Sequence, residues 1–229
     1  MQECAIHVAP DPNSRPDSVY YRQMGATQNL AAFVLAGGKS TRMGADKAFL
    51  TYGGSTLLVR ALELVRKFAR DVSILGSSNK FAHYAPVIED ICPDRGPLGG
   101  IHAALTASQS DLNLMLAVDM PFVSADFLSY LVEQARGAPA VVTLPQTDNR
   151  LQPLAAIYRR DFAAIAKAAL RDGRNKIGPL FASVETRIIE EDELRRHGFS
   201  SALFRNINTP AELQELQEEQ NSESIRSRI

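Results

Sequence analysis

The sequence is poor in cysteine, in net charge and in long apolar runs. Its 229 residues include two cysteines, Cys4 and Cys92, whose spacing suggests neither a disulfide framework nor a metal site, so we expect a protein of the reducing cytoplasm. The formal net charge of −1 gives no general attraction to nucleic acid or to an anionic membrane. No apolar run reaches the roughly 18 residues that a membrane-spanning helix needs. Nucleic-acid partners and membrane insertion are therefore not expected.

Catalysis by a side-chain nucleophile also has no support. The four histidines are scattered along the chain, and none lies near a serine and an acid in the pattern of a catalytic triad. Cys92 has no neighbouring feature that marks a reactive thiol, and it is interpreted as a small buried residue. Any reaction at this protein must use another kind of group.

The composition is that of an ordinary globular protein, with 45% hydrophobic and 22% charged residues. The length favours one domain, which we place at residues 30–217. Residues 1–29 hold three prolines and no periodic pattern, and they are predicted to be a disordered extension without a secretory signal. Met24 is an alternative start. The polar residues 218–229 are predicted to be a frayed tail.

Within the predicted domain, strand-like and helix-like segments alternate. Strands are predicted at 31–35, 72–75, 85–89, 112–118, 140–144, 153–158 and 187–189. Helices are predicted at 57–67, 100–107, 125–136, 161–170 and 210–217. Ser124 is a suitable N-cap for the third of these helices. The alternation predicts an α/β fold with a mostly parallel sheet.

The most informative segment follows the first predicted strand and reads Leu35-Ala-Gly-Gly-Lys-Ser-Thr-Arg-Met-Gly-Ala-Asp-Lys47. The adjacent glycines Gly37 and Gly38 let backbone N–H groups approach a phosphate closely. Arg42 and Lys47 add positive charge where a polyphosphate would lie. The segment therefore predicts a polyphosphate site.

Two common phosphate-binding loops do not fit this segment. A P-loop would need its first glycine at position 33, which is Phe33. The dinucleotide motif G-x-G-x-x-G would need a glycine at position 39, which is Lys39. The segment is glycine-rich and basic, but it belongs to neither class.

An acidic residue ends the most apolar predicted strand. Asp119 follows Asn113-Leu-Met-Leu-Ala-Val118, and a carboxylate at such a position is costly unless it is paired or binds a cation. Mg²⁺ is often held by one or two carboxylates together with substrate phosphates. Asp119 is thus a candidate Mg²⁺ ligand; the alternative is an aspartate that caps the turn before Pro121. Because parallel strands gather ligand sites at their carboxyl ends, we expect Asp119 near the Leu35 loop, Gly76 and Asp90.

These residues carry a family resemblance. The pattern L-A-G-G-x-S-x-R-M-G-x-D-K resembles the signature of nucleotidyltransferases, and within them the chain most resembles the molybdenum cofactor guanylyltransferases. The similarity is dense over residues 32–50 and recurs in pieces as far as residue 213. It implies a three-layer, Rossmann-like nucleotidyltransferase fold with a mostly parallel, mixed sheet. It also implies transfer of GMP from GTP to molybdenum-molybdopterin, with Mg²⁺ as cofactor and pyrophosphate as the second product.

The resemblance implies three sets of site residues. The catalytic set comprises Arg42 and Lys47 on the phosphates and Asp119 on Mg²⁺. The nucleotide is expected to contact Leu35, Ala36, Gly37, Gly38, Lys47, Asp90 and Asp119. The acceptor is expected to contact Gly96, Gly99, Gly100, Arg174, Lys176, Asn206 and Asn208.

Several of these positions have simpler interpretations, which stay open at this stage. Asp90 fits a turn, and the pair Gly99-Gly100 also fits a tight turn before a helix. The segment 172–176 has the character of a solvated loop. Thr209 before Pro210 is a good helix N-cap. Asn79 is a candidate contact for the base or ribose, although it comes slightly late in the sequence for that role.

Two alternative functions remain open on the sequence. One is transfer of CMP from CTP to molybdopterin or to another phosphorylated small molecule, since the signature loop is common to these enzymes. The other is a non-catalytic nucleotide-binding adaptor. The resemblance also allows transient contacts with cofactor-biosynthesis or acceptor enzymes.

Overall fold

The structure is a computed structural model, and it describes residues 30–37, 46–90, 95–207 and 212. The predicted extension 1–29, with Met24, and the predicted tail 218–229 lie outside the described residues. Of the predicted helix 210–217, the structure describes Glu212 alone, which is helical.

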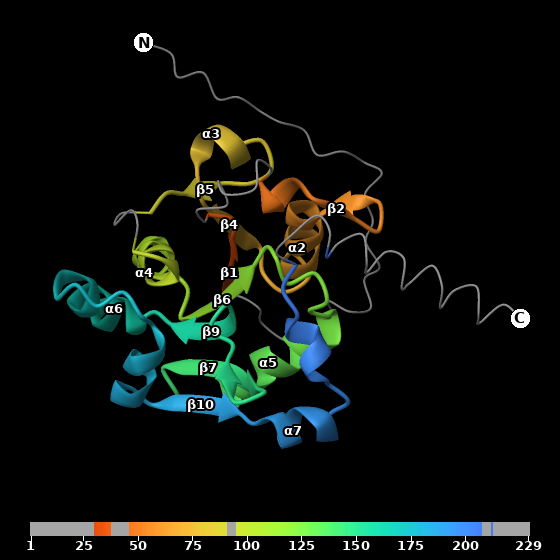
Figure 1. The fold of residues 1–229 in the computed structure, drawn as a ribbon. Coiled ribbons are helices and arrows are strands. Elements are labelled where there is room, and N and C mark those ends of the chain that lie inside the picture. Colours follow the sequence, from red (N-terminus) through yellow and green to blue (C-terminus); the bar gives the residue numbers. More distant parts are fainter. Residues whose placement is uncertain (1–29, 38–45, 91–94, 208–211, 213–229) are drawn as a thin grey trace, which may run out of the picture.

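A mixed sheet of eight strands forms the centre of the described part of the chain (Figure 1). Its main order is β10-β7-β9-β6-β1-β4-β5, and β8 pairs with β7. The strands are β1 (Leu30–Leu35), β4 (Asp71–Leu75), β5 (Val87–Ile88), β6 (Leu112–Ala117), β7 (Val142–Thr147), β8 (Arg150–Leu151), β9 (Ala155–Arg159) and β10 (Thr186–Ile189).

The direction of the strands divides the sheet into two parts. Strands β5, β4, β1 and β6 are parallel to one another. Strand β9 is antiparallel to both β6 and β7, whereas β10 is parallel to β7. This arrangement confirms the predicted α/β fold with a mostly parallel, mixed sheet, and it places β6 in the interior of the sheet.

Helices cover both faces of the sheet (Figure 1). Helices α2 (Leu57–Val65) and α5 (Ala125–Gly137) pack on one face, and α4 (Pro97–Ala107) and α6 (Phe162–Arg171) pack on the other. Ala32 and Val34 belong to the first core and Ala31 and Phe33 to the second, because successive side chains of a strand point to opposite faces. These residues belong to β1, and burial of both its faces explains why its sequence is an uninterrupted apolar run.

The helices begin where the sequence supplies caps. Ser124 accepts a hydrogen bond from the backbone N–H of Phe127 through Oγ (3.1 Å), which confirms its predicted role as N-cap of α5. Thr56 caps α2 in the same way through the N–H of Val59 (3.3 Å). Helix α5, with 13 residues, is the longest that the structure describes, and none of the described helices is both long and apolar enough to cross a membrane.

Several short elements were not predicted. They are the pair β2 (Thr51–Tyr52) and β3 (Ser55–Thr56), strand β8, the helices α3 (Ser78–Phe81) and α7 (Glu191–Arg196), and the 3₁₀ helices η3 (Lys47–Phe49), η4 (Gly178–Ser183) and η5 (Ser201–Phe204). Each spans two to six residues, which is too short for a periodic pattern to be seen. Strands β7 and β8 meet through Asp148 and Asn149, which both have positive φ (50° and 57°), as a two-residue hairpin turn requires.

Candidate active site

The carboxyl ends of four parallel strands meet at one edge of the sheet. The N–H groups of Ala36 and Gly37 donate to the carbonyl of Leu75 at the end of β4 (3.0 and 2.9 Å). On the other side, the N–H of Val118 donates to the carbonyl of Leu35 (3.0 Å). The predicted neighbours from β1, β4 and β6 are therefore side by side.

Gly37 and Gly76 allow two backbones to approach closely at this edge. A Cβ atom on Gly37 would lie 3.4 Å from the Cα of Gly76, and one on Gly76 would lie 2.8 Å from the ring of Phe81. The Phe81 ring therefore gives Gly76 a structural reason to be glycine, whereas a Cβ on Gly37 would make only ordinary contacts. The contact of Gly37 with a nucleotide, like those of Leu35 and Ala36, stays a prediction.

Lys47 and Asp119 face each other across this edge. Lys47 begins η3 and Asp119 follows β6, and their Nζ and Oδ2 atoms are 3.7 Å apart. Both side chains are partly accessible, at 25% and 21% exposure, so a ligand can reach them. The structure thus joins two residues that lie 72 positions apart in the sequence and that were predicted to act together.

The environment of Asp119 raises the pKa of its carboxyl. Burial is the main cause, because it disfavours the charged form, and the ammonium of Lys47 opposes the shift. A carboxylate that burial makes costly is stabilised when a further cation approaches. The position therefore fits the predicted Mg²⁺ ligand.

Asp46 fixes the start of η3 and with it the place of Lys47. One carboxylate oxygen accepts the N–H of Ala48 (3.2 Å) as an N-cap. The other accepts from Nζ of Lys80 in α3 (2.8 Å). Asp46 thus orients the loop and pairs with Lys80, a contact that no local pattern marks because 34 residues separate the two.

Asp90 lies against the first turn of α4. Its carboxylate oxygens are 2.6 and 2.7 Å from the place where a Cβ on Gly99 would stand. The N–H of Gly99 donates to the carbonyl of Gly96 (3.2 Å). Asp90 thus connects the end of β5 to the predicted acceptor loop, and the protein's own carboxylate occupies part of the space before this helix.

The two predicted acceptor segments lie together on the α4 side of the sheet. Nη1 of Arg95, just before α4, donates to Oδ1 of Asn175 (3.2 Å), which joins the loop at Gly96 to the segment 172–176. Within that segment Arg174 pairs with Asp172 (3.1 Å), while Lys176 is exposed. Sequence reasoning missed Arg95 and Asn175, because nothing local marks a contact across 80 residues.

The late segment that includes Asn206 borders Asp119. The N–H of Ile207 donates to the carbonyl of Asp119 (2.8 Å), so this segment reaches the same edge of the sheet, and the contact of Asn206 with the acceptor stays a prediction. Gly38, Arg42 and Asn208 lie outside the described residues. Asn79 lies in α3, where Glu89 accepts the N–H of Ser78 (2.8 Å); the contact of Asn79 with a nucleotide stays a prediction.

The described residues contain no group of three or more histidine, cysteine, aspartate or glutamate side chains arranged to hold a metal ion. Mg²⁺ usually keeps several waters and binds through one or two carboxylates plus substrate phosphates. A single carboxylate such as Asp119 therefore fits a Mg²⁺ ion that arrives with a polyphosphate.

Comparison with known proteins adds independent evidence. The model of the MobA-like NTP transferase domain matches residues 32–186. The chain is 32% identical over 182 residues to a probable molybdenum cofactor guanylyltransferase of Pelotomaculum thermopropionicum, which covers 79% of this chain and 88% of that protein. It is 31% identical to the molybdenum cofactor guanylyltransferase of Syntrophotalea carbinolica, with 78% and 86% covered.

A solved structure agrees with these matches. Molybdopterin-guanine dinucleotide biosynthesis protein A of Archaeoglobus fulgidus superposes with a TM-score of 0.71 at 27% identity. The superposition covers 84% of this chain and 99% of that one.

Proposed function

Because this chain belongs to the MobA-like NTP transferase family and is a nucleotidyltransferase of molybdenum cofactor biosynthesis, we propose that it transfers GMP from GTP to molybdenum-molybdopterin. The observation that carries the proposal is the Lys47–Asp119 pair, 3.7 Å apart at the carboxyl ends of β1 and β6. A cation and an acid this close together support a site for a triphosphate with its metal ion. The names of the relatives support guanine and molybdopterin as the two halves of the product.

The reaction needs alignment and charge neutralisation rather than a side-chain nucleophile. A phosphate oxygen of the acceptor attacks the α-phosphorus of GTP, the new P–O bond forms, and the bond to pyrophosphate breaks. Negative charge builds on the transferring phosphoryl group and on the leaving pyrophosphate. The ammonium of Lys47 is proposed to stabilise this charge, with Arg42 assisting it.

Asp119 is the proposed ligand of Mg²⁺, together with the phosphates of GTP. When bound, the ion would neutralise phosphate charge and orient the α-phosphorus. Lys47 keeps a second positive charge beside the Asp119 carboxylate, so its ammonium would bind phosphate oxygens next to the ion.

The acceptor would enter from the α4 side. Gly96, Gly99 and Gly100 form the start of α4, and the cations Arg174 and Lys176 lie in the segment that Arg95 ties to it. These residues are proposed to receive the phosphorylated pterin. Asp90, between this group and β5, is proposed to contact the nucleotide.

The test is a parallel incubation with GTP and with CTP, each with Mg²⁺ and molybdenum-molybdopterin, in which pyrophosphate release and the dinucleotide product are measured. We expect product with GTP and at least about tenfold less with CTP, since one set of base contacts discriminates by roughly 1.4 kcal/mol or more. Equal or greater turnover with CTP would refute the guanylyl assignment. Pyrophosphate release with GTP and a different phosphorylated acceptor, but none with molybdopterin, would refute the assignment of molybdopterin as the acceptor.

A further inference from the structure

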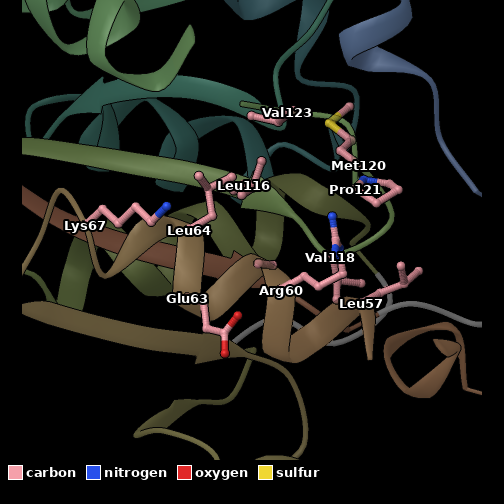
Figure 2. Close-up of a pocket in the computed structure, with 11 residues that line it drawn as sticks. Leu57, Arg60, Glu63, Leu64, Lys67, Leu116, Val118, Met120, Pro121 and Val123 are labelled. Carbon is pink, nitrogen blue, oxygen red and sulfur yellow. The ribbon is translucent and has the colours of Figure 1, made fainter. Parts of the chain in front are cut away.

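A groove of about 230 Å³ lies between α2 and the segment that follows β6 (Figure 2). Leu64 of α2 and Leu116, Val118, Met120 and Val123 supply apolar walls. Residues on both sides of Asp119 line the groove, Val118 before it and Met120 after it. Its occupant would therefore contact the segment that carries the proposed Mg²⁺ ligand.

Two cations belong to the rim of this groove. Arg60 lies over the ring of Tyr52, with its guanidinium carbon 5.1 Å from the ring centre, and Lys67 stands further along the same side. The Nε of Arg60 is buried, and within the described part of the chain it has no hydrogen-bond partner. Among the described residues that line the groove, Glu63 is the one acid, and its carboxylate points away from Leu116 and Met120 (Figure 2). A buried donor without a partner is costly, so the groove suits an occupant that is apolar and carries acids.

The chain itself reaches this groove near its C-terminus. The N–H of Ile207 donates to the carbonyl of Asp119, beside Met120 of the groove wall. Five residue steps separate Ile207 from Glu212, at most about 17 Å of extended chain. Glu212 is helical and half-buried, so the chain at that point is already against other residues.

The sequence beyond Ile207 has the apolar and acidic residues that would complement the apolar walls and the cations of the groove. Leu213 and Leu216 are three residues apart and share one side of a helix. Acids surround them, at Glu212, Glu215, Glu218 and Glu219, and the sequence has no lysine or arginine between Arg205 and Arg226. We propose that the groove is the docking site of this chain's own segment 212–219, as a helix whose leucines pack on Leu64, Val118 and Met120 and whose acids approach Arg60 and Lys67.

Docking would hold the segment 118–123 from outside and so fix the carbonyl and side chain of Asp119. Apolar burial of two leucines would stabilise such a contact. The docking does not depend on which nucleotide is used, so its test is separate from that of guanylyl transfer.

The first experiment compares two full-length variants by hydrogen–deuterium exchange without nucleotide. Leu213→Asp/Leu216→Asp should increase exchange at least about tenfold in peptides covering residues 57–67 and 116–123, and lower the melting temperature by at least about 4 °C. Gln214→Asp/Asn221→Asp adds the same charge away from the leucines and should leave both readouts as in the wild type. Equal exchange in wild type and Leu213→Asp/Leu216→Asp would overturn the proposal.

The second experiment identifies the occupant by zero-length carbodiimide cross-linking and mass spectrometry. We expect an amide between Lys67 and a glutamate of 212–219 within one chain. Lys67→Gln should remove that cross-link, and Lys167→Gln, on α6 at the opposite face of the sheet, should not. Cross-links of these glutamates to Lys167 instead, or only between two differently isotope-labelled chains, would overturn the proposal.

Discussion

The carboxylate of Asp90 lies directly against Gly99, with oxygens 2.6 and 2.7 Å from the position that a Cβ atom would take. Position 99 is the third residue of α4, where a helix otherwise tolerates alanine better than glycine. The next residue, Gly100, has only an ordinary contact at its Cβ position, 3.7 Å from Leu75. A side chain at position 99 would therefore clash with the Asp90 carboxylate, whereas a Cβ atom at position 100 would not.

The first prediction uses this difference. Gly99→Ala should displace the Asp90 carboxylate and raise the KM for the nucleotide about tenfold, if Asp90 contacts it as proposed. Gly100→Ala should instead stabilise the protein by about 0.5–1 kcal/mol through helix propensity. Urea unfolding and steady-state kinetics measure the two effects.

A double-mutant cycle provides the control for that prediction. In an Asp90→Ala background, Gly99→Ala should have no further effect on KM, because the displaced group is already gone. If Gly99→Ala raises KM equally in both backgrounds, the close contact with Asp90 is not the cause.

The second prediction concerns Lys47. Lys47→Met should lower kcat by about 10²–10³-fold, the usual loss when one preorganised positive group is removed from a transition state. Lys80→Met is the matched control, because Lys80 is also a lysine near this edge but pairs with Asp46 and is 56% exposed. Its loss should change the free energy of unfolding by no more than about 1 kcal/mol. Similar kcat values for Lys47→Met and the wild type, in pyrophosphate release assays, would exclude the proposed role.

The third prediction concerns Asp119 and pH. Burial raises the pKa of this carboxyl above its unfolded value, so the native state binds more protons than the unfolded state in the range between the two values. Stability is therefore lost as pH rises through that range, and the ionised carboxylate remains a cost at neutral pH. Asp119→Asn should stabilise the protein at pH 7, and this gain should vanish below about pH 3.8, where the side chain is neutral in both states.

The same substitution should abolish turnover with Mg²⁺. We expect kcat to fall by at least about 10²-fold. Thermal unfolding from pH 3 to 8 and pyrophosphate release at pH 7 measure the two effects. Full turnover of Asp119→Asn would disprove the metal assignment, whereas lower stability at pH 7 would mean that burial does not dominate the energetics of the carboxylate.

The elements that were predicted from the sequence are those with a local physical signal. The run Leu112–Ala117 is apolar at nearly every position because β6 is buried on both faces, and Ser124 is read as a cap from its own chemistry. Helix α7 was missed because its six residues are mostly charged and show no apolar period. Tertiary contacts stabilise it instead, such as the hydrogen bond between Glu193 and Tyr130. The turn at Asp148 and Asn149 could have been found, since these residue types tolerate positive φ.

The candidate site also contains residues that the sequence predicted and residues that only the structure revealed. Lys47 and Asp119 could be identified from their own sequence motifs. Ligand sites in α/β folds form at the carboxyl ends of parallel strands, and this rule predicted that the two motifs would lie close together. The contacts of Asp90 with Gly99 and of Arg95 with Asn175 depend on how β5, α4 and the segment 172–176 pack. Residues that act through tertiary contact leave no local pattern, so they required the structure.

The last prediction tests a buried polar cluster between α5, β10 and α7. The hydroxyl of Tyr130 donates to Glu193 (2.7 Å), which also accepts from Arg187, and Tyr130 is only 9% exposed. Burial, and then the Glu193 carboxylate, raise the pKa of Tyr130 to about 12 from an ordinary value of 10. Between these values the unfolded chain loses the phenol proton and the native protein keeps it, so stability should fall as pH rises, by a total of about 2–3 kcal/mol.

Tyr130→Phe removes this titration but also the hydrogen bond. It should cost about 1 kcal/mol at pH 8, and its stability should then decline less steeply than that of the wild type above pH 10, so that the difference disappears or reverses by pH 12. Tyr84→Phe, at an exposed tyrosine, is the matched control and should follow the wild type. Urea unfolding from pH 8 to 12 gives the curves, and parallel curves for Tyr130→Phe and the wild type would show that the Glu193 contact does not hold the phenol proton. Because Glu193 lies in α7, a helix that the sequence did not predict, this measurement also tests whether the Tyr130 contact anchors α7 to α5.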